Sequence, residues 1–253
     1  MTQVTEDGFL GGRLRIAQPV GGFRSGIDAV LLAAAVPARA GETALELGLG
    51  AGAASLSLGA RVPGLGLAGL ELQPAYAALA RQNAQANGIV LEVVEGDVAA
   101  MPAVLKARRF DHLLMNPPYY RREGGTAARD AGRETARGES ASGEGVALAD
   151  WVAAAARRLA PGGWLTAIHR ADRLPDLLAA CTGRLGSVEA KPLAPREGRP
   201  ASLVIVRARQ GGRAAFRLHA PLVLHQGDRH AQDGESYRPE VQEILRNGTA
   251  LDF

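Results

Sequence analysis

The sequence predicts an α/β fold with a mainly parallel sheet and helices on both faces. Between about residues 43 and 208, short apolar segments alternate with helix-like segments, and this rhythm is typical of βαβ units. The chain has 253 residues, of which 47% are hydrophobic and 22% charged. This size and composition match one large globular domain, or one domain with an appendage.

Six short apolar segments, bounded by glycine, proline or charged residues, have the continuous apolar character of strands buried on both faces. They are Thr43–Leu47, Leu67–Leu70, Leu91–Val94, His112–Met115, Trp164–Ile168 and Leu203–Val206. Beyond them, Phe216–Leu224 resembles another strand and Arg238–Arg246 a short terminal helix. We expect these last two elements to complete the sheet and cover one edge rather than form a separate domain.

Three longer segments have helical patterns that end at glycine or proline, which are helix stop signals. They are Ile27–Val36, Pro74–Asn87 and Leu148–Leu159. The first precedes the first expected strand, and the other two fill gaps between strands. This order supports a parallel sheet built from crossover connections.

Composition excludes several classes of protein. No apolar run approaches the roughly 20 residues that a bilayer requires, the N-terminus lacks a signal-peptide pattern, and Cys181 is the single cysteine. We therefore expect a cytoplasmic protein without membrane attachment. Only two of the 29 cationic residues are lysines. Arginine suits phosphates and base edges, although the parallel abundance of alanine and glycine favours a GC-rich genome as the cause.

One interval breaks the alternation of strands and helices. Arg121–Gly145 has no apolar residue larger than alanine, with five arginines and five acidic residues. Such a length without structure is uncommon inside a compact domain and is usually functional or disordered. Because it follows the strongest motif of the chain, we expect a mobile loop that serves as a lid or contacts the substrate.

The first motif is a glycine-rich turn, Glu46-Leu47-Gly48-Leu49-Gly50-Ala51-Gly52, between an expected strand and an expected helix. Glycines allow a tight turn and close approach of a ligand to the backbone. The pattern is G-x-G-x-G rather than the G-x-G-x-x-G of dinucleotide sites, and Glu46 precedes it. Both features favour a nucleoside ligand whose amino group needs a carboxylate, although a purely structural turn remains open.

Acidic residues follow the next two strands. Glu71 could accept both hydroxyls of a ribose, because a carboxylate offers two acceptor oxygens. Asp97 could accept a hydrogen bond from the exocyclic amine of an adenine, with the amide of Val98 facing a ring nitrogen. The alternatives are an exposed or helix-capping acid at Glu71 and an N-cap of a following helix at Asp97.

The fourth motif, Asn116-Pro117-Pro118-Tyr119, ends the strand His112–Met115. Two prolines make this strand end rigid and remove two N–H donors. The Asn116 side-chain oxygen and the Pro117 carbonyl could then hold a planar NH2 group, while Tyr119 offers a ring on which a base stacks. In amine methylation these acceptors would position the nitrogen lone pair and stabilise the developing positive charge.

Taken in order, ELGLGAG, Glu71, Gly96-Asp97 and NPPY resemble the class I S-adenosylmethionine-dependent methyltransferases that methylate exocyclic amines. The segments DGFLGGRLRIAQPVGGFRSGIDAVLLAAA, PLAPREGRPA and PLVLH narrow the resemblance. With NPPYY, they are similar to the bacterial tRNA (adenine-N6)-methyltransferases that modify adenosine 37 beside the anticodon of a valine tRNA. This resemblance covers nearly the whole chain. It implies a Rossmann-like fold with a seven-stranded, mostly parallel sheet.

The resemblance also implies a domain organisation and site residues. Residues 1–40 would be an N-terminal segment whose helix flanks the cofactor site, and residues 41–253 the methyltransferase domain. Asn116, Pro117, Pro118 and Tyr119 would hold the target base as catalytic residues. The cofactor S-adenosylmethionine would contact a larger set: Arg24, Ser25, Asp28, Glu46, Gly48, Gly50, Gly52, Glu71, Leu72, Asp97, Val98 and Asn116. Arg24, Ser25 and Asp28 would lie near the cofactor carboxylate or the target.

Several points of the resemblance remain open. Glu46 stands where an aspartate is more usual, and the loop Arg121–Gly145 is no fixed family feature. His169, Arg170 and Arg196 also match the subfamily, and we interpret His169 as a structural residue at a strand end rather than a base. The expected partner is a nucleic acid, the tRNA anticodon loop, contacted by the arginines of the loop; we expect no metal and a monomer or weak dimer.

NPPY is shared by enzymes with other substrates. They include DNA adenine-N6, ribosomal guanine-N2 and protein glutamine methyltransferases, and the last usually carry an additional N-terminal helical domain. Outside catalysis, the chain could be an inactive protein that binds S-adenosylmethionine or RNA, which the intact NPPY disfavours. A nicotinamide dehydrogenase is disfavoured by the glycine spacing.

Overall fold

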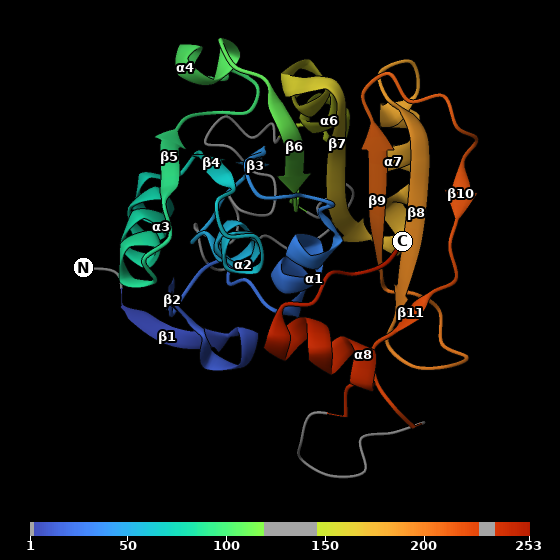
Figure 1. Cartoon of the computed structure of the whole chain (residues 1–253), viewed down its shortest axis with the longest axis horizontal. Coiled ribbons are helices and arrows are strands. Elements are labelled where there is room, and N and C mark those ends of the chain that lie inside the picture. Colours follow the sequence, from blue (N-terminus) through green and yellow to red (C-terminus); the bar gives the residue numbers. More distant parts are fainter. Residues whose placement is uncertain (1–2, 119–145, 228–235) are drawn as a thin grey trace.

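The fold is built around one sheet that has helices on both faces (Figure 1). The structure is a computed structural model that describes residues 3–118, 146–227 and 236–253. Tyr119 and the expected loop Arg121–Gly145 lie outside the described residues. Within the described parts of the chain, every helix is too short or too polar to cross a membrane.

Nine strands of the described residues form this sheet, in the order β10-β8-β9-β7-β6-β3-β4-β5, with β11 also paired to β8. The run from β7 to β5 is parallel, whereas β9 is antiparallel to both β7 and β8. The bounds are β3 (Thr43–Leu47), β4 (Gly66–Glu71), β5 (Leu91–Glu95), β6 (Phe110–Met115), β7 (Leu159–Arg170), β8 (Gly186–Ala194), β9 (Leu203–Arg209), β10 (Arg217–Leu218) and β11 (Leu222–Val223).

The mostly parallel sheet that the sequence predicts is confirmed, whereas the described residues form nine strands instead of the seven that the resemblance implies. The expected strand Phe216–Leu224 instead forms the two-residue strands β10 and β11. Pro221 lies in the break between them, where its missing N–H cannot contribute to a ladder of hydrogen bonds. β8 had no counterpart among the expected strands.

Successive residues of the central strands point to opposite faces and are buried on both. Leu45, Leu47 and Met115 belong to one apolar cluster, and Ala44 and Leu114 to the other. Helices cover the two faces, with α1, α2 and α3 toward the second cluster and α4, α6 and α7 toward the first. They are α1 (Ile27–Ala35), α2 (Ala53–Arg61), α3 (Pro74–Ala86), α4 (Ala103–Lys106), α6 (Leu148–Arg158) and α7 (Leu174–Cys181).

An antiparallel hairpin precedes α1 and forms a small sheet of its own. It consists of β1 (Val4–Phe9) and β2 (Leu14–Pro19), joined by a 3₁₀ turn, η1 (Leu10–Gly12). Two asparagines, one in α3 and one directly after it, bind the free edge of β2: Asn83 pairs with the N–H and C=O of Ala17, and Asn87 with those of Arg15. Side-chain amides therefore take the place of a neighbouring strand.

The C-terminal segment packs on the face that carries α1. The expected helix Arg238–Arg246 is a single turn of α-helix, α8 (Pro239–Gln242), followed by a wider π-helical turn, η3 (Glu243–Asn247). Val241 and Ile244 are buried in the same cluster as α1. Of the remaining short elements, η2 (Ala171–Arg173) joins β7 to α7.

Candidate active site

The carboxyl ends of β3, β4, β5 and β6 bring the four sequence motifs to one edge of the sheet. The strands are in register there, with Leu47 opposite both Leu70 and Met115, and Glu71 opposite Glu95. The glycine turn, Glu71, Asp97 and Asn116 follow these positions directly. In open parallel sheets, ligands bind in the crevice outside the carboxyl ends of the strands.

The glycine-rich turn after β3 requires glycine for two reasons. Gly48, Gly50 and Gly52 have φ values of 72°, 56° and 89°, which place all three in the left-handed region. A Cβ on Gly48 would also lie 2.8 Å from Cη2 of Trp151 on α6. The turn is tied to β4, since the N–H groups of Gly48 and Leu49 donate to the Leu70 carbonyl at 2.9 and 3.0 Å.

Glu71 joins the glycine turn to the end of β4. Its side chain is buried, with 6% of the residue exposed. One carboxylate oxygen accepts from the N–H of Gly50 at 2.7 Å and the other from the N–H of Gln73 at 2.9 Å. Burial raises the pKa of this carboxyl. The carboxylate also accepts from the backbone N–H of Leu72, and because it offers about four lone-pair sites it can still accept from a ligand. Leu72 itself is 47% exposed, so a polar acceptor and an open apolar surface adjoin one another.

Glu46 anchors the start of α2. One of its oxygens accepts from both the N–H and the hydroxyl of Ser55, at 2.9 and 2.5 Å. The residue is only 3% exposed, and burial raises the pKa of its carboxyl to about 8. Contact between Glu46 and a ligand amine remains a prediction, because the contacts present are with the helix.

Asp97 lies in a turn rather than at a helix N-terminus. Its Oδ1 accepts from the N–H of Ala99 at 2.8 Å, and the next helix, α4, begins only at Ala103. The alternative in which Asp97 is the N-cap of a following helix is therefore wrong. The side chain is half-buried beside the buried Val98, a placement compatible with binding a base edge.

Asn116, at the end of β6, is held in one orientation. Its Nδ2 donates to Oδ2 of Asp28 at 2.8 Å. Because a carboxylate accepts but does not donate, the NH2 group must face Asp28. The Asn116 Oδ1 atom is buried and has no hydrogen-bond partner among the described residues. Leaving a buried acceptor unpaired costs about 1–3 kcal/mol, and such groups call for an explanation.

His169, near the end of β7, forms a hydrogen bond to the backbone of Pro118 in the NPP segment. Its Nδ1 accepts from the N–H of Arg170 at 2.8 Å, which leaves Nε2 as the donor in the neutral ring. Burial, aided by the charge of Arg173, lowers the pKa of His169 to about 4, against the effect of a hydrogen bond to the backbone of Pro118. A neutral, buried imidazole bonded to Pro118 agrees with the structural role expected for it.

Arg24 and Ser25 are engaged by the N-terminal hairpin. The Arg24 guanidinium binds the hydroxyl of Thr5 at 2.6 Å, the Pro19 carbonyl at 2.9 Å and the Asp7 carboxylate at 2.5 Å. The N–H of Ser25 donates to Gln18 Oε1 at 2.7 Å. Of the three residues proposed from this segment, Asp28 is the one with a hydrogen bond to a motif residue among the described contacts.

Two other residues suggested by the sequence have structural partners. Arg170 forms an exposed ion pair with Asp172 at 2.6 Å. Arg196 is nearly buried and donates to the carbonyls of Gln226 and Gly227. It thereby ties the turn after β8 to the segment that follows β11.

The sequence analysis did not identify three residues that lie beside the site: Phe23, Tyr76 and Trp151. Phe23 lies 3.9 Å from where a Cβ of Gly50 would be, and its N–H and carbonyl bind the hydroxyl of Tyr76 at 2.8 and 3.0 Å. Trp151 packs on Gly48. An aromatic residue that directly follows Gly21-Gly22 was an available signal for Phe23, whereas nothing local marks Trp151.

Comparisons with known proteins show which family the chain is similar to. Residues 24–135 match the family model of the methyltransferase small domain. Curated tRNA1(Val) (adenine(37)-N6)-methyltransferases from two strains of Porphyromonas gingivalis are similar to this chain. The W83 protein is 35% identical over 178 residues (65% of this chain, 66% of the relative), and the ATCC 33277 protein 34% over 188 residues (69% and 70%). The chain thus aligns with about two thirds of each relative's length.

Two further proteins bear on the fold and on the substrate. A crystal structure described as a predicted O-methyltransferase from Agrobacterium tumefaciens matches with a TM-score of 0.68 and 28% identity, covering 88% of this chain and 97% of that one. A release factor glutamine methyltransferase from Geobacter sulfurreducens is 32% identical over 124 residues, 48% of this chain and 43% of the relative. The chain therefore belongs to the tRNA1(Val) (adenine(37)-N6)-methyltransferase family of class I S-adenosylmethionine-dependent methyltransferases.

Proposed function

We propose that this chain transfers the methyl group of S-adenosylmethionine to the exocyclic N6 amine of an adenine in RNA, and that the substrate is adenosine 37 of a tRNA. The observation that carries the proposal is the buried Oδ1 of Asn116, which has no hydrogen-bond partner within residues 3–118, 146–227 and 236–253 and whose direction Asp28 fixes. An acceptor prepared in this way suits an incoming NH2 group. The names of the similar Porphyromonas proteins supply the base and the tRNA.

The residues along the strand ends fit the cofactor. Gly48, Gly50 and Gly52 give a backbone that a ligand can approach closely, and Glu71 offers acceptor lone pairs for ribose hydroxyls next to the exposed Leu72. We propose that Glu46 serves the amino group, Asp97 and Val98 the adenine, and that Arg24 and Ser25 support the segment covering the turn. When bound, S-adenosylmethionine supplies an electrophilic methyl group.

The chain's own part in the reaction is to position the amine. Asn116 Oδ1 and the Pro117 carbonyl accept hydrogen bonds from the two N–H groups of the amine. These bonds orient the nitrogen lone pair toward the methyl group and stabilise the positive charge that develops on nitrogen. Tyr119 would stack on the base and Pro118 would keep the strand end rigid. His169 is unsuited to act as a base, because its Nδ1 already accepts a hydrogen bond and its pKa is lowered to about 4. Solvent can take the proton once the amine is methylated.

A protein glutamine is the second candidate substrate. Its side-chain amide would present an NH2 group to the same two acceptors, and the Geobacter relative is a release factor glutamine methyltransferase. The longer alignments with the Porphyromonas proteins favour RNA. Guanine N2 in ribosomal RNA and adenine N6 in DNA are further outcomes of the same assay.

Nucleoside mass analysis tests the proposal. Total tRNA, ribosomal RNA, DNA and release factors are incubated separately with the protein and S-adenosylmethionine, with Asn116→Ala as the matched control. We expect N6-methyladenosine in tRNA with the wild-type protein and a loss of at least about 100-fold in the variant. N2-methylguanosine, or methylglutamine in a release factor, would redirect the proposal; full activity of Asn116→Ala would contradict the assigned site.

A further inference from the structure

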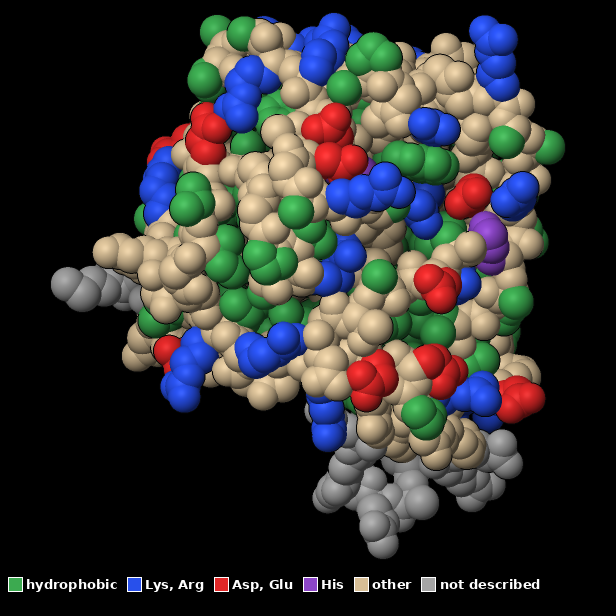
Figure 2. All heavy atoms as spheres, viewed as in Figure 1, with side chains coloured by type: hydrophobic (Ala, Val, Ile, Leu, Met, Phe, Trp, Pro, Cys, Tyr) green, Lys and Arg blue, Asp and Glu red, His purple; other side chains and the backbone are tan. Residues whose placement is uncertain are grey.

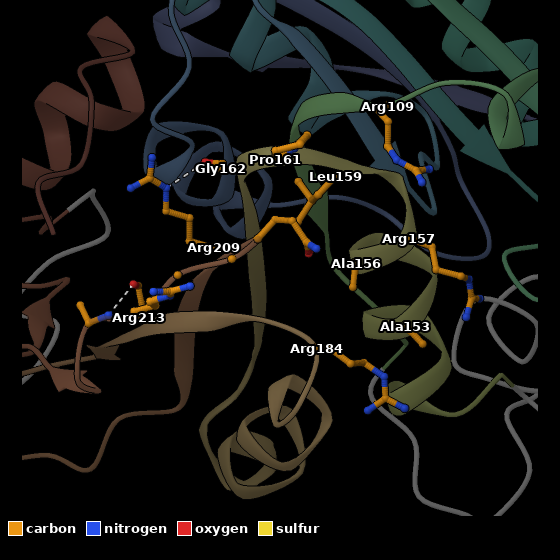
Figure 3. Close-up of a pocket in the computed structure, with 15 residues that line it drawn as sticks. Arg109, Ala153, Ala156, Arg157, Leu159, Pro161, Gly162, Arg184, Arg209 and Arg213 are labelled. Atoms are coloured by element: carbon orange, nitrogen blue, oxygen red, sulfur yellow. Dashed lines mark hydrogen bonds between the residues drawn. The ribbon is translucent and has the colours of Figure 1, made fainter.

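An open hollow of about 1160 Å³ lies at the opposite edge of the sheet from the candidate active site (Figure 3). It is formed by the start of β7, the end of the antiparallel β9 and the neighbouring ends of α6 and β8. His169 lies near the end of β7 beside the candidate active site, whereas Gly162 near the start of the strand lines the hollow. At ~3.3 Å per residue the strand between them spans about 23 Å, so the hollow is a separate feature.

Five arginines line this hollow, and none of its described lining residues is acidic. They are Arg109, Arg157, Arg184, Arg209 and Arg213, all exposed. The whole chain carries nearly as many acidic residues as basic ones, 26 against 29, and the face in Figure 2 shows the two kinds interspersed. The hollow therefore departs locally from the balanced charge of the rest of the chain.

The charges of these arginines are not neutralised within the described residues. No ion pair within 4.0 Å joins any of the five to a described acidic side chain. Arg209 donates to the Gly162 carbonyl at 2.9 Å and Arg184 to the Ala180 carbonyl at 3.2 Å, which leaves guanidinium N–H groups available. Like charges of this density focus a positive potential over a concave surface.

The arginines of the hollow lie close enough together to affect the pKa of a neighbouring residue, Arg158. The pKa of Arg158 is lowered first by burial and then by the charges of Arg109 and Arg157. An external anion at the hollow would relieve this repulsion.

The arrangement of the arginines indicates the kind of anion. Figure 3 shows the guanidinium groups distributed around the rim, with Arg209 and Arg213 on one side and Arg157 and Arg184 on the other. They do not converge on one point, as a site for a single small phosphate would require. Separated, exposed arginines around an open hollow match the repeated phosphates of a nucleic-acid backbone.

We propose that this arginine-lined hollow binds the sugar-phosphate backbone of the substrate RNA, at the opposite ends of the strands from the base that is methylated. The inference rests on the proposed function, since it assigns part of the same substrate to a second surface. The hollow contributes affinity without reading sequence, because phosphate contacts position an RNA and carry no base information. Recognition of the base remains with the strand ends.

Charge-removing variants test this inference. Arg157→Gln/Arg213→Gln removes one arginine from each side of the hollow, at positions with no hydrogen bond among the described contacts. The matched control, Arg15→Gln/Arg81→Gln, makes the same change of charge on β2 and α3 at the other side of the molecule, where the ion pairs are exposed and contribute little. Binding of fluorescent tRNA is measured across a salt series, with S-adenosylmethionine binding as the test of intact folding.

We expect the hollow variant to bind tRNA at least about tenfold more weakly and to reduce the slope of log K against log salt by about 2, roughly one per lost phosphate contact. KM for tRNA rises while kcat and cofactor affinity stay unchanged. Equal affinity and slope in the hollow variant and the wild-type protein would overturn the inference, as would an equal loss in the control variant.

Failure of the proposed function gives a different result. If the wild-type protein binds tRNA but does not methylate it, the proposed substrate is wrong, and the salt series still decides the role of the hollow. If the wild-type protein does not bind tRNA at all, both proposals fall. If the wild-type protein methylates tRNA and the hollow variant binds tRNA as tightly as the wild type, the inference about the hollow is wrong and the proposed function stands.

Discussion

Asp28 fixes the orientation of Asn116 across 88 positions of sequence, through a 2.8 Å hydrogen bond between its Oδ2 and the Asn116 Nδ2. The bond connects the first turn of α1 with the end of β6. It commits the amide nitrogen to Asp28 and leaves the buried amide oxygen as an acceptor. The N-terminal segment thereby completes the site that the strand ends begin.

Replacing Asp28 by asparagine should lower kcat by about 10- to 100-fold, because the new NH2 group takes the place of the Oδ2 acceptor and no longer holds the Asn116 amide with its nitrogen toward residue 28. The substitution preserves Oδ1, which accepts the N–H of Gly26 at 3.0 Å at the start of α1. Affinity for S-adenosylmethionine and the melting temperature should change little. Steady-state kinetics measures kcat, and calorimetry measures cofactor affinity and the melting temperature. An unchanged kcat would contradict the orienting role of Asp28.

Stability should depend on pH through Glu46. Burial raises its folded pKa to about 8 from an ordinary value of 4.5, so the folded chain holds a proton that the unfolded chain releases. This contribution is fully present below about pH 4.5 and is lost as the pH rises through 8. Between pH 6 and 9 the free energy of unfolding of the wild-type protein should fall by about 2–3 kcal/mol more than that of Glu46→Gln. Urea unfolding of both proteins at the two pH values checks this; parallel pH dependences would contradict it.

His169 should shape the site without titrating during the reaction. Its pKa is lowered to about 4 from 6.5, so it is neutral near pH 7. Its contribution to stability is present above about pH 6.5 and is lost as the pH falls through 4. We expect His169→Gln, whose Nε2 can still donate, to retain more activity than His169→Ala. The kcat profiles of the wild-type protein and His169→Gln should have the same form between pH 6 and 8, and a limb present only in the wild type would indicate a base.

Gly48→Ala should destabilise the chain and weaken cofactor binding. The backbone φ of 72° is strained for alanine, and its Cβ would lie 2.8 Å from Trp151. We expect the two effects together to lower the free energy of unfolding by about 2–4 kcal/mol. Trp151→Leu should relieve the contact but not the backbone strain. A double-mutant cycle from urea unfolding should therefore give a loss that is smaller than the sum of the single losses; strict additivity would show that Trp151 is not the obstacle.

The regular part of the fold was predictable from local pattern. The strand Thr43–Leu47 has the bounds that the sequence predicts, and α1, α3 and α6 differ from their expected ends by one residue. These elements have strong apolar runs and clear glycine or proline stops. The meeting of the four motifs at one edge follows from parallel pairing alone.

What escaped prediction depends on contacts between distant or weakly patterned segments. β8 contains Glu189, Lys191 and Pro192, which obscure its apolar alternation. β1 is largely exposed, so its apolar pattern is weak, and β2 is held at its free edge by the side chains of Asn83 and Asn87 rather than by a neighbouring strand. The bond between Asp28 and Asn116 carries no local signal at either residue, although each was singled out for a different reason.

The central claim is that Asn116 presents the acceptor for the N6 amine of tRNA adenosine 37. Its most direct test is to locate the methyl group by mass analysis of ribonuclease fragments from tRNA treated with wild-type protein or Asn116→Ala. We predict one methyl group on N6 of adenosine 37 with the wild-type protein and none above background with the variant. Methylation at another nucleotide, or an unchanged product from Asn116→Ala, would contradict the claim.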